Sequence, residues 1–457
     1  MSSLVSRSAR AGVAVVAAGA LAAAGLASTP HRTAVRTTGK TFSIGVPIPM
    51  IHVGSHGHFM GATPPGPGSC GCYEPAQFEA AYDLAPLYAA GDNGKGETIV
   101  IVDSFGSKTI KADLATFDTG FKLPAPPSFK IITPEGAVGS NSSWATETTL
   151  DVEYSHAIAP DANIILVETP VSETVGAAGF KQIVAAENYV ISNKAALGIT
   201  GGAVISQSFG TAEQTFGSGF ASKIAAFRSA YQAAQTAGVT VLAASGDDGA
   251  TGCSNAATPC SLYSHRVNSW PSSDPLVTSV GGLQFSISTT TPFHQTAAPV
   301  VWNDGSPLFG GAGGGGDSAA FTIPTFQSSV STIVGKWRGT PDVSMSASVA
   351  GGAEIYQTGL GWTSVGGTSE ATPEFAGIVA IADQVAGKGL GDLDAALYGL
   401  EAAGGTNGIV DVTSGNNSFN GVTGYTAVKG YDMASGIGTI DAKTFIPALV
   451  AEVGKVG

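Results

Sequence analysis

The sequence predicts an α/β fold in which helices cover both faces of a mainly parallel sheet. Four uninterrupted apolar runs have the composition of buried parallel strands, at residues 98–103, 164–168, 203–206 and 239–243. Residues 180–192 and 221–237, between these runs, and residues 75–90, before the first run, have apolar side chains at helical spacing and predict helices. Because ligands of such sheets bind beyond the carboxyl ends of the strands, the polar residues there are candidates for a site: Asp103, Ser206-Gln207-Ser208 and Ser245-Gly246-Asp247.

Composition divides the chain into three parts. Residues 1–28 have a basic start, an Ala-rich apolar stretch and small residues near their end, which is typical of a cleaved secretory signal peptide. An uncleaved N-terminal anchor is the alternative. Residues 29–72 are rich in Thr, Pro, Gly and His and lack periodicity, so we expect an irregular N-terminal extension. Residues 73–457 carry the predicted elements and form one domain.

The charge balance limits the classes of partner. With 21 basic and 34 acidic residues, the net charge is −13, which argues against nucleic acid and anionic membranes. Only 12% of residues are charged, which fits an exported protein. Outside the signal peptide, no stretch is long and apolar enough to span a bilayer.

Cysteines and histidines leave several readings open. Cys253 and Cys260 bracket a short loop and predict a local disulfide after export. Cys70 and Cys72 are one residue apart, a strained spacing for a mutual bridge, and four cysteines allow three pairings. The histidines at 52, 56 and 58 form either a metal-binding tract or a solvated tail.

Ser369 is the first candidate for catalysis. A glycine pair precedes Thr368-Ser369, and a helical apolar run follows at once, so this serine lies where a loop becomes a helix. We expect Pro373 in the first helical turn, where its missing N–H removes no helix bond. Unpaired N–H groups and the helix dipole suit chemistry that builds an oxyanion. The alternative is an ordinary helix N-cap.

A base for this serine is sought among carboxylates as well as histidines. The stretch 144–159 has the pattern of a helix on which Glu147 and Asp151, four residues apart, share one face. His156 lies roughly on the opposite face. Because two neighbouring carboxylates repel, one pKa rises, and a glutamate with a raised pKa can act as general base. The alternative is an ordinary acidic helix face.

Three motifs in order now resemble those of the sedolisins, the serine-carboxyl peptidases with a subtilisin-like fold. Glu147 and Asp151, followed by His-Ala-Ile-Ala-Pro, resemble the family's acidic helix. Ser-Gly-Asp247, followed by Trp270-Pro271 and a Val-Gly-Gly, resembles its oxyanion motif, and Gly-Thr-Ser369 with Pro373 resembles its nucleophile motif. The similarity runs from about residue 75 to the C-terminus and implies a three-layer subtilisin-like domain.

The resemblance implies a role for each of these side chains. Ser369 would be the nucleophile, and Glu147 the general base that later protonates the leaving amine. Asp151 would orient Glu147, as the third member of a triad does. Asp247 would be the oxyanion partner. Since a carboxylate would repel an oxyanion, Asp247 must be protonated, which fits activity at acid pH. As an alternative, Asp247 is a turn residue.

The resemblance also implies one structural Ca²⁺ ion near the C-terminus. Asp411 and Asp432 would supply carboxylate oxygens, and Val412, Val428 and Gly430 would supply backbone carbonyls. Hard oxygen ligands suit calcium. The family usually has glycine where Val428 stands. Two turn aspartates without a metal are the alternative.

Other segments match the family or depart from it. The glycine-rich residues 310–316, with Asp317-Ser318, resemble a loop beside the family's substrate cleft. Phe209 stands where the family commonly has tryptophan, which could alter the support behind Glu147. Family members usually carry a folded propeptide, for which we expect no room between residues 28 and 73.

These observations predict a secreted, calcium-stabilised, acid-acting serine-carboxyl endopeptidase. It would cut polypeptides through an acyl-enzyme as a monomer, with no nucleic-acid partner and no membrane contact after signal removal. One alternative keeps the enzyme but releases tripeptides from N-termini. Another, of a different class, is a secreted non-catalytic homologue that binds peptides.

Overall fold

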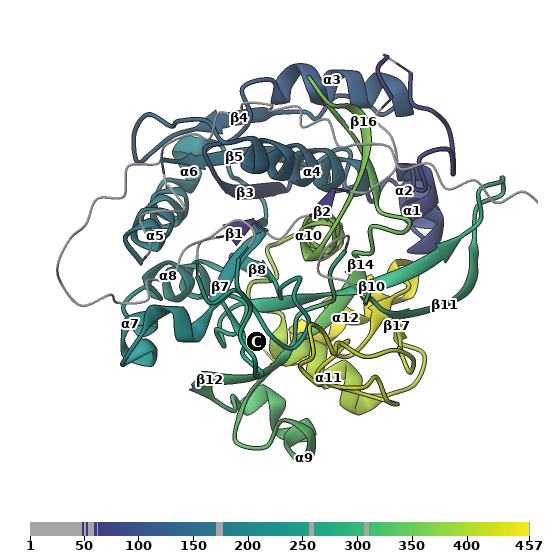
Figure 1. Ribbon diagram of the computed structural model, residues 1–457. Coiled ribbons are helices and arrows are strands. Elements are labelled where there is room, and N and C mark those ends of the chain that lie inside the picture. The colour runs from purple at the N-terminus through teal and green to yellow at the C-terminus, as the bar shows by residue number, and fades with distance from the viewer. Residues whose placement is uncertain are drawn as a thin grey trace, which may run out of the picture. The chain divides into compact units, whose positions relative to one another are not determined.

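The computed structural model describes residues 48–49, 52–53, 59–61, 63–170, 177–255, 260–305 and 310–456. The expected signal peptide, His56 and His58 lie outside these residues. In the described part, the central sheet has eight strands, all in parallel pairs except for β10 with β11 (Figure 1). The strand order is β11 (Gln295–Val301), β10 (Thr278–Ile287), β8 (Thr240–Ala244), β6 (Ala203–Gln207), β3 (Thr98–Ser104), β5 (Asn163–Thr169) and β4 (Phe129–Ile132), and β14 (Val343–Ser346) also pairs with β10.

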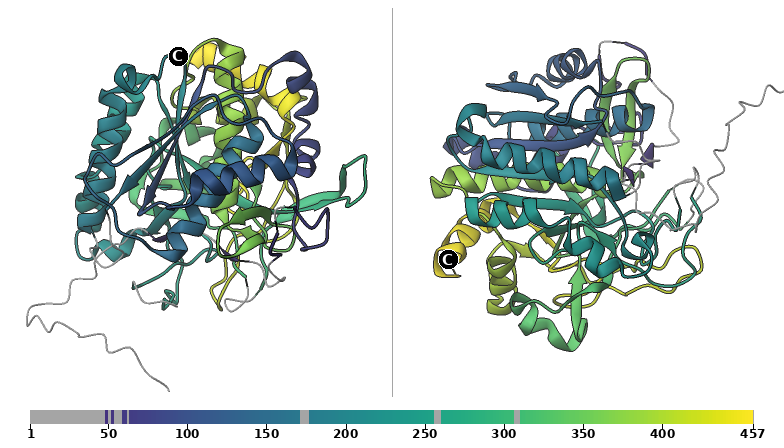
Figure 2. Two further views of the ribbon diagram at one scale, coloured as in Figure 1. Left: turned by 90° about the horizontal axis from the view of Figure 1, so that it is seen from above. Right: turned by 90° about the vertical axis from the view of Figure 1, so that its left-hand side faces the viewer.

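Alternate residues of each strand face different cores, which confirms the expected layers. Ile99 and Ile101 of β3 pack with the core that includes α4 (Ser142–Ile158), α10 (Thr368–Ala386) and α12 (Ala442–Val456). Val100 and Val102 pack with the core that includes α5 (Ala177–Ser192) and α8 (Ser229–Ala237), which lie side by side (Figure 2). Burial on both faces explains why these strands are apolar throughout.

Two of the predicted helices are each two shorter helices. The stretch 75–90 divides into α1 (Pro75–Ala81) and α2 (Ala85–Ala90), because Asp83 adopts a left-handed φ of 53° that no helix continues through. The stretch 221–237 divides into α7 (Phe220–Ala225) and α8. The other helices are α3 (Ile110–Phe121), α6 (Lys194–Leu197), α9 (Ser331–Val334) and α11 (Asp394–Ala403), with 3₁₀ helices η1 (Glu213–Phe216) and η2 (Thr325–Val330).

Small sheets attach to the edges of this core. In the extension that we expected to be irregular, β1 (Ile48–Pro49) pairs with β7, and β2 (His52–Val53) pairs with β16. No described helix combines the length and apolar character that crossing a membrane requires. The pairs of strands are β7 (Phe209–Ala212) with β9 (Ser269–Trp270), β15 (Ala353–Gln357) with β16 (Gly361–Gly366), β12 (Gly316–Thr322) with β13 (Trp337–Thr340), and β17 (Ile409–Val410) with β18 (Thr439–Ile440).

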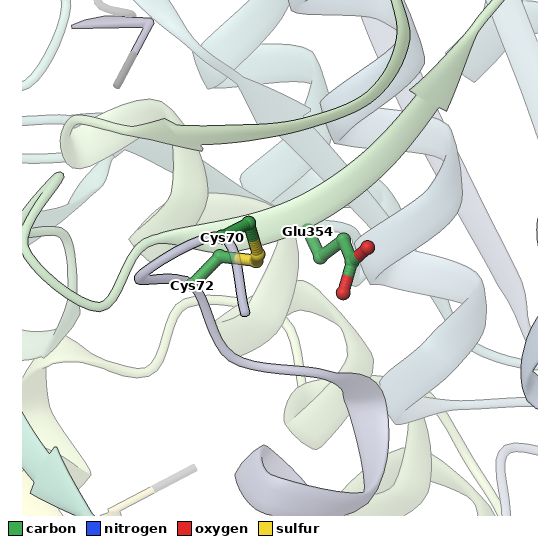
Figure 3. A group of neighbouring side chains, drawn as sticks. All are labelled: Cys70, Cys72 and Glu354. Atoms are coloured by element: carbon green, nitrogen blue, oxygen red, sulfur yellow. A yellow bond between two sulfur atoms is a disulfide. The ribbon is translucent and has the colours of Figure 1, made fainter. Parts of the chain in front are cut away.

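Both pairs of neighbouring cysteines form disulfides. Cys253 bonds to Cys260, which confirms the predicted local bridge. Cys70 bonds to Cys72, the pairing that their short spacing made us regard as strained, and Glu354 lies beside it (Figure 3). Each of the two disulfides has a carboxylate neighbour, Glu354 or Asp248. Because disulfide sulfurs are not thiolates, we assign no metal to either group.

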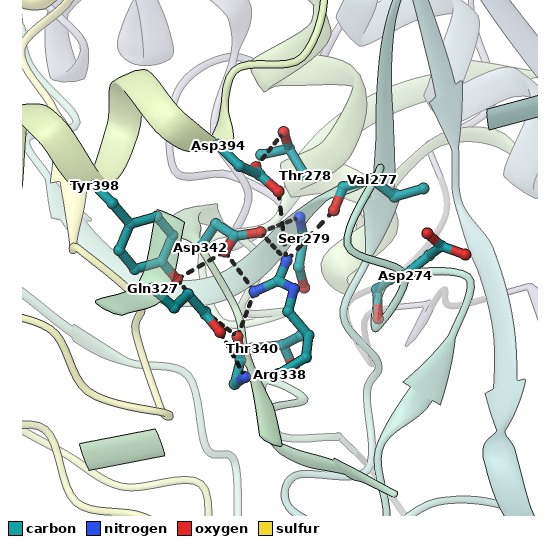
Figure 4. A network of polar contacts seen from close by, with 12 residues as sticks. Asp274, Val277, Thr278, Ser279, Gln327, Arg338, Thr340, Asp342, Asp394 and Tyr398 are labelled. Carbon is teal, nitrogen blue, oxygen red and sulfur yellow. Dashed lines mark hydrogen bonds and ion pairs between the residues drawn. The ribbon is translucent and has the colours of Figure 1, made fainter. Parts of the chain in front are cut away.

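A buried ion-pair network joins the sheet to the C-terminal helices (Figure 4). The Arg338 guanidinium, fully buried, donates to both carboxylate oxygens of Asp342, and Asp394 lies 3.8 Å away. The Tyr398 hydroxyl on α11 donates to Asp342 at 2.8 Å. The Ser279 N–H on β10 donates to the same carboxylate at 2.7 Å. The network therefore fixes the end of β13 against β10 and α11.

Candidate active site

Ser369 is the second residue of α10, a helix that follows strand β16 after the single residue Gly367. Gly367 caps the helix with a φ of 118°, a backbone conformation that favours glycine. Our placement of Pro373 in the first turn is wrong, because it is the sixth residue of the helix. Its missing N–H therefore leaves the carbonyl of Ser369 without the usual helix partner. The Ser208 hydroxyl lies 3.5 Å from that carbonyl oxygen instead.

Ser208 connects the nucleophile candidate to the acidic helix. The Ser369 hydroxyl donates to the Ser208 carbonyl at 3.3 Å, and the Ser208 hydroxyl donates to Asp151 Oδ1 at 2.7 Å. Ser208 lies between β6 and β7, whereas Asp151 lies on α4. Helices α4 and α10 pack against each other, so the structure brings Ser369, Glu147 and Asp151 together. Sequence reasoning noted Ser208 only as part of a strand-end motif.

Glu147 is buried beside these groups. Burial raises its pKa well above the usual range, and the negative charges of Asp151 and Asp103 raise it further. The nearby Ser369 hydroxyl favours the charged form of Glu147, although its hydrogen bond in this structure goes to Ser208. Neither Glu147 oxygen has a hydrogen-bond partner among the described residues. This carboxyl group can therefore accept the serine proton after a small rotation of the hydroxyl.

Asp103 is a member of the cluster to which we assigned no catalytic role from the sequence. It is buried at the end of β3, and burial raises its pKa to about 7. Burial also raises the pKa of Asp151 well above the usual range, and the charge of Asp103 adds to this effect. A hydrogen bond between the two carboxyls favours ionised Asp103 and protonated Asp151. The signal in the sequence was an acid at the end of a buried strand.

Asp247 lies at the turn after β8, against the start of α10. Its Oδ1 accepts hydrogen bonds from the N–H and the hydroxyl of Thr368, at 2.8 and 2.7 Å. Burial raises the pKa of Asp247 well above its usual range, and the two Thr368 bonds oppose the rise. The carbonyl of Asp247 accepts the N–H of Ala312 at 2.9 Å. The structure thus places the glycine-rich loop beside this aspartate.

The loop is held close by its glycines. The N–H of Gly314 donates to the Gly246 carbonyl at 2.7 Å. A Cβ atom at Gly314 would lie 2.3 Å from the Ser245 carbonyl oxygen, so no larger residue fits without a shift of the backbone. The buried backbone of this loop therefore packs directly against the turn that carries Asp247.

His156 and Phe209 also have defined surroundings. A ring nitrogen of His156 lies 2.7 Å from the Pro124 carbonyl and 3.3 Å from Asp118, on the side of α4 expected to face away from the carboxyl pair. The Phe209 ring packs against Trp144 of α4 with ring centres 6.1 Å apart. An aromatic side chain thus still supports the acidic helix, although it is not the tryptophan common in the family.

The five expected calcium ligands come from two loops that lie together. The N–H of Gly430 donates to both oxygens of Asp411, at 3.2 and 3.1 Å, and the N–H of Val428 donates to Asp432 at 2.9 Å. The loop at 428–432 therefore closes on both carboxylates, while Val412 is buried beside Asp411. Two carboxylates with neighbouring carbonyls are a donor set that fits a hard cation such as Ca²⁺.

Fold and site together define a subtilisin-like α/β protein with a serine and a carboxyl cluster in place of a catalytic histidine. No protein-family model matches the chain. Kumamolisin of Bacillus sp. (strain MN-32) is 31% identical over 378 residues, which cover 80% of this chain and 62% of kumamolisin. Sedolisin of Pseudomonas sp. (strain 101) is 38% identical over 215 residues, or 46% of this chain and 35% of that protein.

Solved structures give the same result. Pseudomonas sedolisin, described as a serine-carboxyl proteinase complexed with two molecules of pseudo-iodotyrostatin, superposes with a TM-score of 0.69 and 27% identity. The superposition covers 84% of this chain and 98% of that one. The chain is therefore similar to the sedolisins in sequence and in fold. It spans less than two thirds of the length of the curated relatives named above.

Proposed function

We propose that this protein is a secreted, acid-acting serine-carboxyl endopeptidase that uses Ser369, Glu147, Asp151 and Asp247. The observation that carries the proposal is the position of Ser369. It lies between the buried carboxyl pair on α4 and the buried Asp247, which accepts hydrogen bonds from the first residue of α10. Relatives named kumamolisin, sedolisin and xanthomonalisin support this class of activity.

The proposed reaction depends on which of these side chains carry a proton at each step. Ser369 Oγ attacks the peptide carbonyl carbon while its proton passes to Glu147, and protonated Asp247 donates a hydrogen bond to the oxyanion. The C–N bond then breaks as Glu147 returns the proton to the leaving amine. Water hydrolyses the acyl-enzyme with Glu147 again acting as base. Turnover needs ionised Glu147 and protonated Asp247 at once, so activity should rise as Glu147 ionises and fall as Asp247 loses its proton.

Casein or haemoglobin digestion between about pH 3 and pH 7 tests the proposal. We expect cleavage that Ser369→Ala and Glu147→Gln each abolish, with both variants folded by circular dichroism. His156→Ala is the matched control, because His156 lies on the same helix but contacts Asp118, and it should retain activity. Cleavage that persists in Ser369→Ala, or none at any pH in the wild type, would reject the peptidase assignment and leave a peptide-binding homologue.

Release of tripeptides is the second candidate activity. Tripeptidyl-peptidase sed4 of Aspergillus fumigatus is 30% identical over 417 residues, and tripeptidyl-peptidase 1 of Canis lupus familiaris is 28% identical over 329 residues. Peptides of one sequence with free or acetylated N-termini separate the two activities. An endopeptidase should cut both peptides, whereas a tripeptidyl-peptidase should cut only the free one.

Calcium and export are parts of the same proposal. Asp411 and Asp432 would hold the ion together with the carbonyls of Val412, Val428 and Gly430, and the ion would stiffen both loops. Adding a chelator should lower the melting temperature of the wild type but not that of an Asp411→Ala variant. Asp92→Ala, a partly exposed aspartate in another loop, should respond to the chelator as the wild type does. N-terminal sequencing of protein exported by an expression host tests the signal peptide.

A further inference from the structure

Two buried glutamates follow Ser369 on its own helix. Glu370 and Glu374 are four residues apart, so they share one face of α10, and both are fully buried. A buried helix face is normally apolar, and a buried carboxyl group is normally paired with a base. Here the charges that act on the two glutamates are acidic: that of Asp247 acts on Glu370, and that of Glu370 acts on Glu374.

The hydrogen bonds of this pair are incomplete unless it carries a proton. The hydroxyl of Tyr82, the residue that follows α1, donates to Glu374 Oε2 at 2.6 Å. The other Glu374 oxygen and both oxygens of Glu370 have no partner at hydrogen-bonding geometry among the described residues, although the Ser346 hydroxyl and the Ala353 N–H lie near Glu370. A proton held by one carboxyl group and donated to the other would give these oxygens a partner. Two ionised carboxylates would instead leave two uncompensated charges in the core.

The pair is also connected to the cap of the nucleophile helix. The Tyr82 hydroxyl that donates to Glu374 accepts the N–H of Ser346, at the end of β14, at 2.9 Å. The next carbonyl, that of Ala347, accepts the N–H of Gly367 at 2.7 Å. Gly367 is the N-cap of α10, two positions before Ser369. The contacts of Glu374 thus support the turn that presents the serine.

We propose that Glu370 and Glu374 are a positioning pair that shares a proton and holds Ser369 in its reactive place. The inference rests on the proposed peptidase function. Neither glutamate is a catalytic residue, because they act through Tyr82, the end of β14 and the helix cap. Ionisation of the second carboxyl group would push the first turn of α10 away from its support, so turnover would fall as the pH rises.

Within the described part of the chain, no basic group acts on the two glutamates to offset that ionisation. Burial raises the pKa of both carboxyl groups well above the usual range, and the charge of Glu370 raises that of Glu374 further. The Ser346 hydroxyl and the Ala353 N–H favour ionised Glu370, and the Tyr82 hydroxyl favours ionised Glu374. The other titratable groups that interact with this pair are all acidic. The charge of Asp247 acts on Glu370. The Tyr154 hydroxyl on α4 interacts with Glu370 and Glu374, and also with Glu153 and Glu354.

Glutamine substitution tests the pair with little change in shape. In Glu374→Gln, the amide can donate to Glu370 and accept from Tyr82, so only one carboxyl group remains to ionise. We expect the fall of kcat at high pH to move up by about one pH unit, with KM and the kcat at acid pH nearly unchanged. Glu370→Gln should shift the same limb in the same direction. Glu374→Ala should lower kcat at every pH, because the Tyr82 hydroxyl loses its acceptor.

Glu187→Gln is the matched control. Glu187 is also a fully buried glutamate without a hydrogen-bond partner in the described structure, but it lies on α5. Its substitution should raise stability at neutral pH and leave the kcat profile unchanged. If the wild type cleaves protein but the kcat profiles of both Gln variants superpose on it, the positioning role is overturned and the peptidase function stands. A wild type inactive at every pH overturns both.

Discussion

Glu187 gives a quantitative test of how buried acids set the stability of this protein. Burial alone raises its pKa from 4.5 to about 8. Because the folded-state pKa is the higher one, its contribution to stability is complete below pH 4.5. The contribution is lost as the pH rises through the interval up to about 8. At pH 7 the group is ionised in the unfolded chain but mostly protonated in the folded one. With 1.36 kcal/mol for each pH unit above 4.5, the loss by pH 7 is about 3 kcal/mol.

Glu187→Gln removes this titration and keeps the shape of the side chain. Urea unfolding at pH 4 and pH 7 measures the free energy of unfolding of both proteins. We expect the variant to gain about 3 kcal/mol relative to the wild type between the two pH values. Glu135→Gln, at a partly exposed turn position, is the control and should show no comparable pH dependence. An equal effect of Glu187→Gln at pH 4 and pH 7 would refute the reasoning.

Three other substitutions address the core and the site. Arg338→Met leaves two buried carboxylates without their cation and should lower the free energy of unfolding in urea by about 3–5 kcal/mol. A smaller loss would show that the ion-pair network around Arg338 does not stabilise the fold. Ser208→Ala removes the hydroxyl between the nucleophile and the acidic helix, and should lower kcat about tenfold at constant KM in steady-state assays. Gly377→Ala places a Cβ 2.7 Å from Ile158 and should cost about 1–3 kcal/mol. Gly454→Ala, where a Cβ meets open space, is its control and should not destabilise.

The sequence predicted the central strands more accurately than the helices. The four predicted strands match β3, β5, β6 and β8 to within one residue at each end, because strands buried on both faces are apolar throughout. The helix expected at 75–90 failed at Asp83, whose left-handed backbone breaks the helix while the apolar spacing continues. Apolar spacing indicates which side chains are buried. It does not show where a helix breaks, because a left-handed residue between two helices leaves the spacing unchanged.

The site was predictable as a set of motifs but not as a connected structure. The motifs identified Ser369, Glu147 and Asp247 as candidates, and the structure places all three in one cluster. The contribution of Ser208 depends on Pro373, which frees a helix carbonyl, and on the packing of α10 against β6. Neither the strand order nor this packing can be read from local patterns. Interactions between distant segments therefore had to come from the fold.

The distribution of buried charge gives one physical reason to expect that stability, and with it the proposed activity, falls as the pH rises. Arg338 balances its carboxylate neighbours by an ion pair. In contrast, burial raises the pKa values of four other acids, and no basic side chain in the described structure counteracts the rise. These acids are Glu147, Glu187, Glu370 and Glu374. Protonation removes the desolvation cost of each, so folding at acid pH requires no counter-ion for them. If acid preference came only from Asp247, substituting the noncatalytic glutamates would change neither the upper pH limit of stability nor that of turnover.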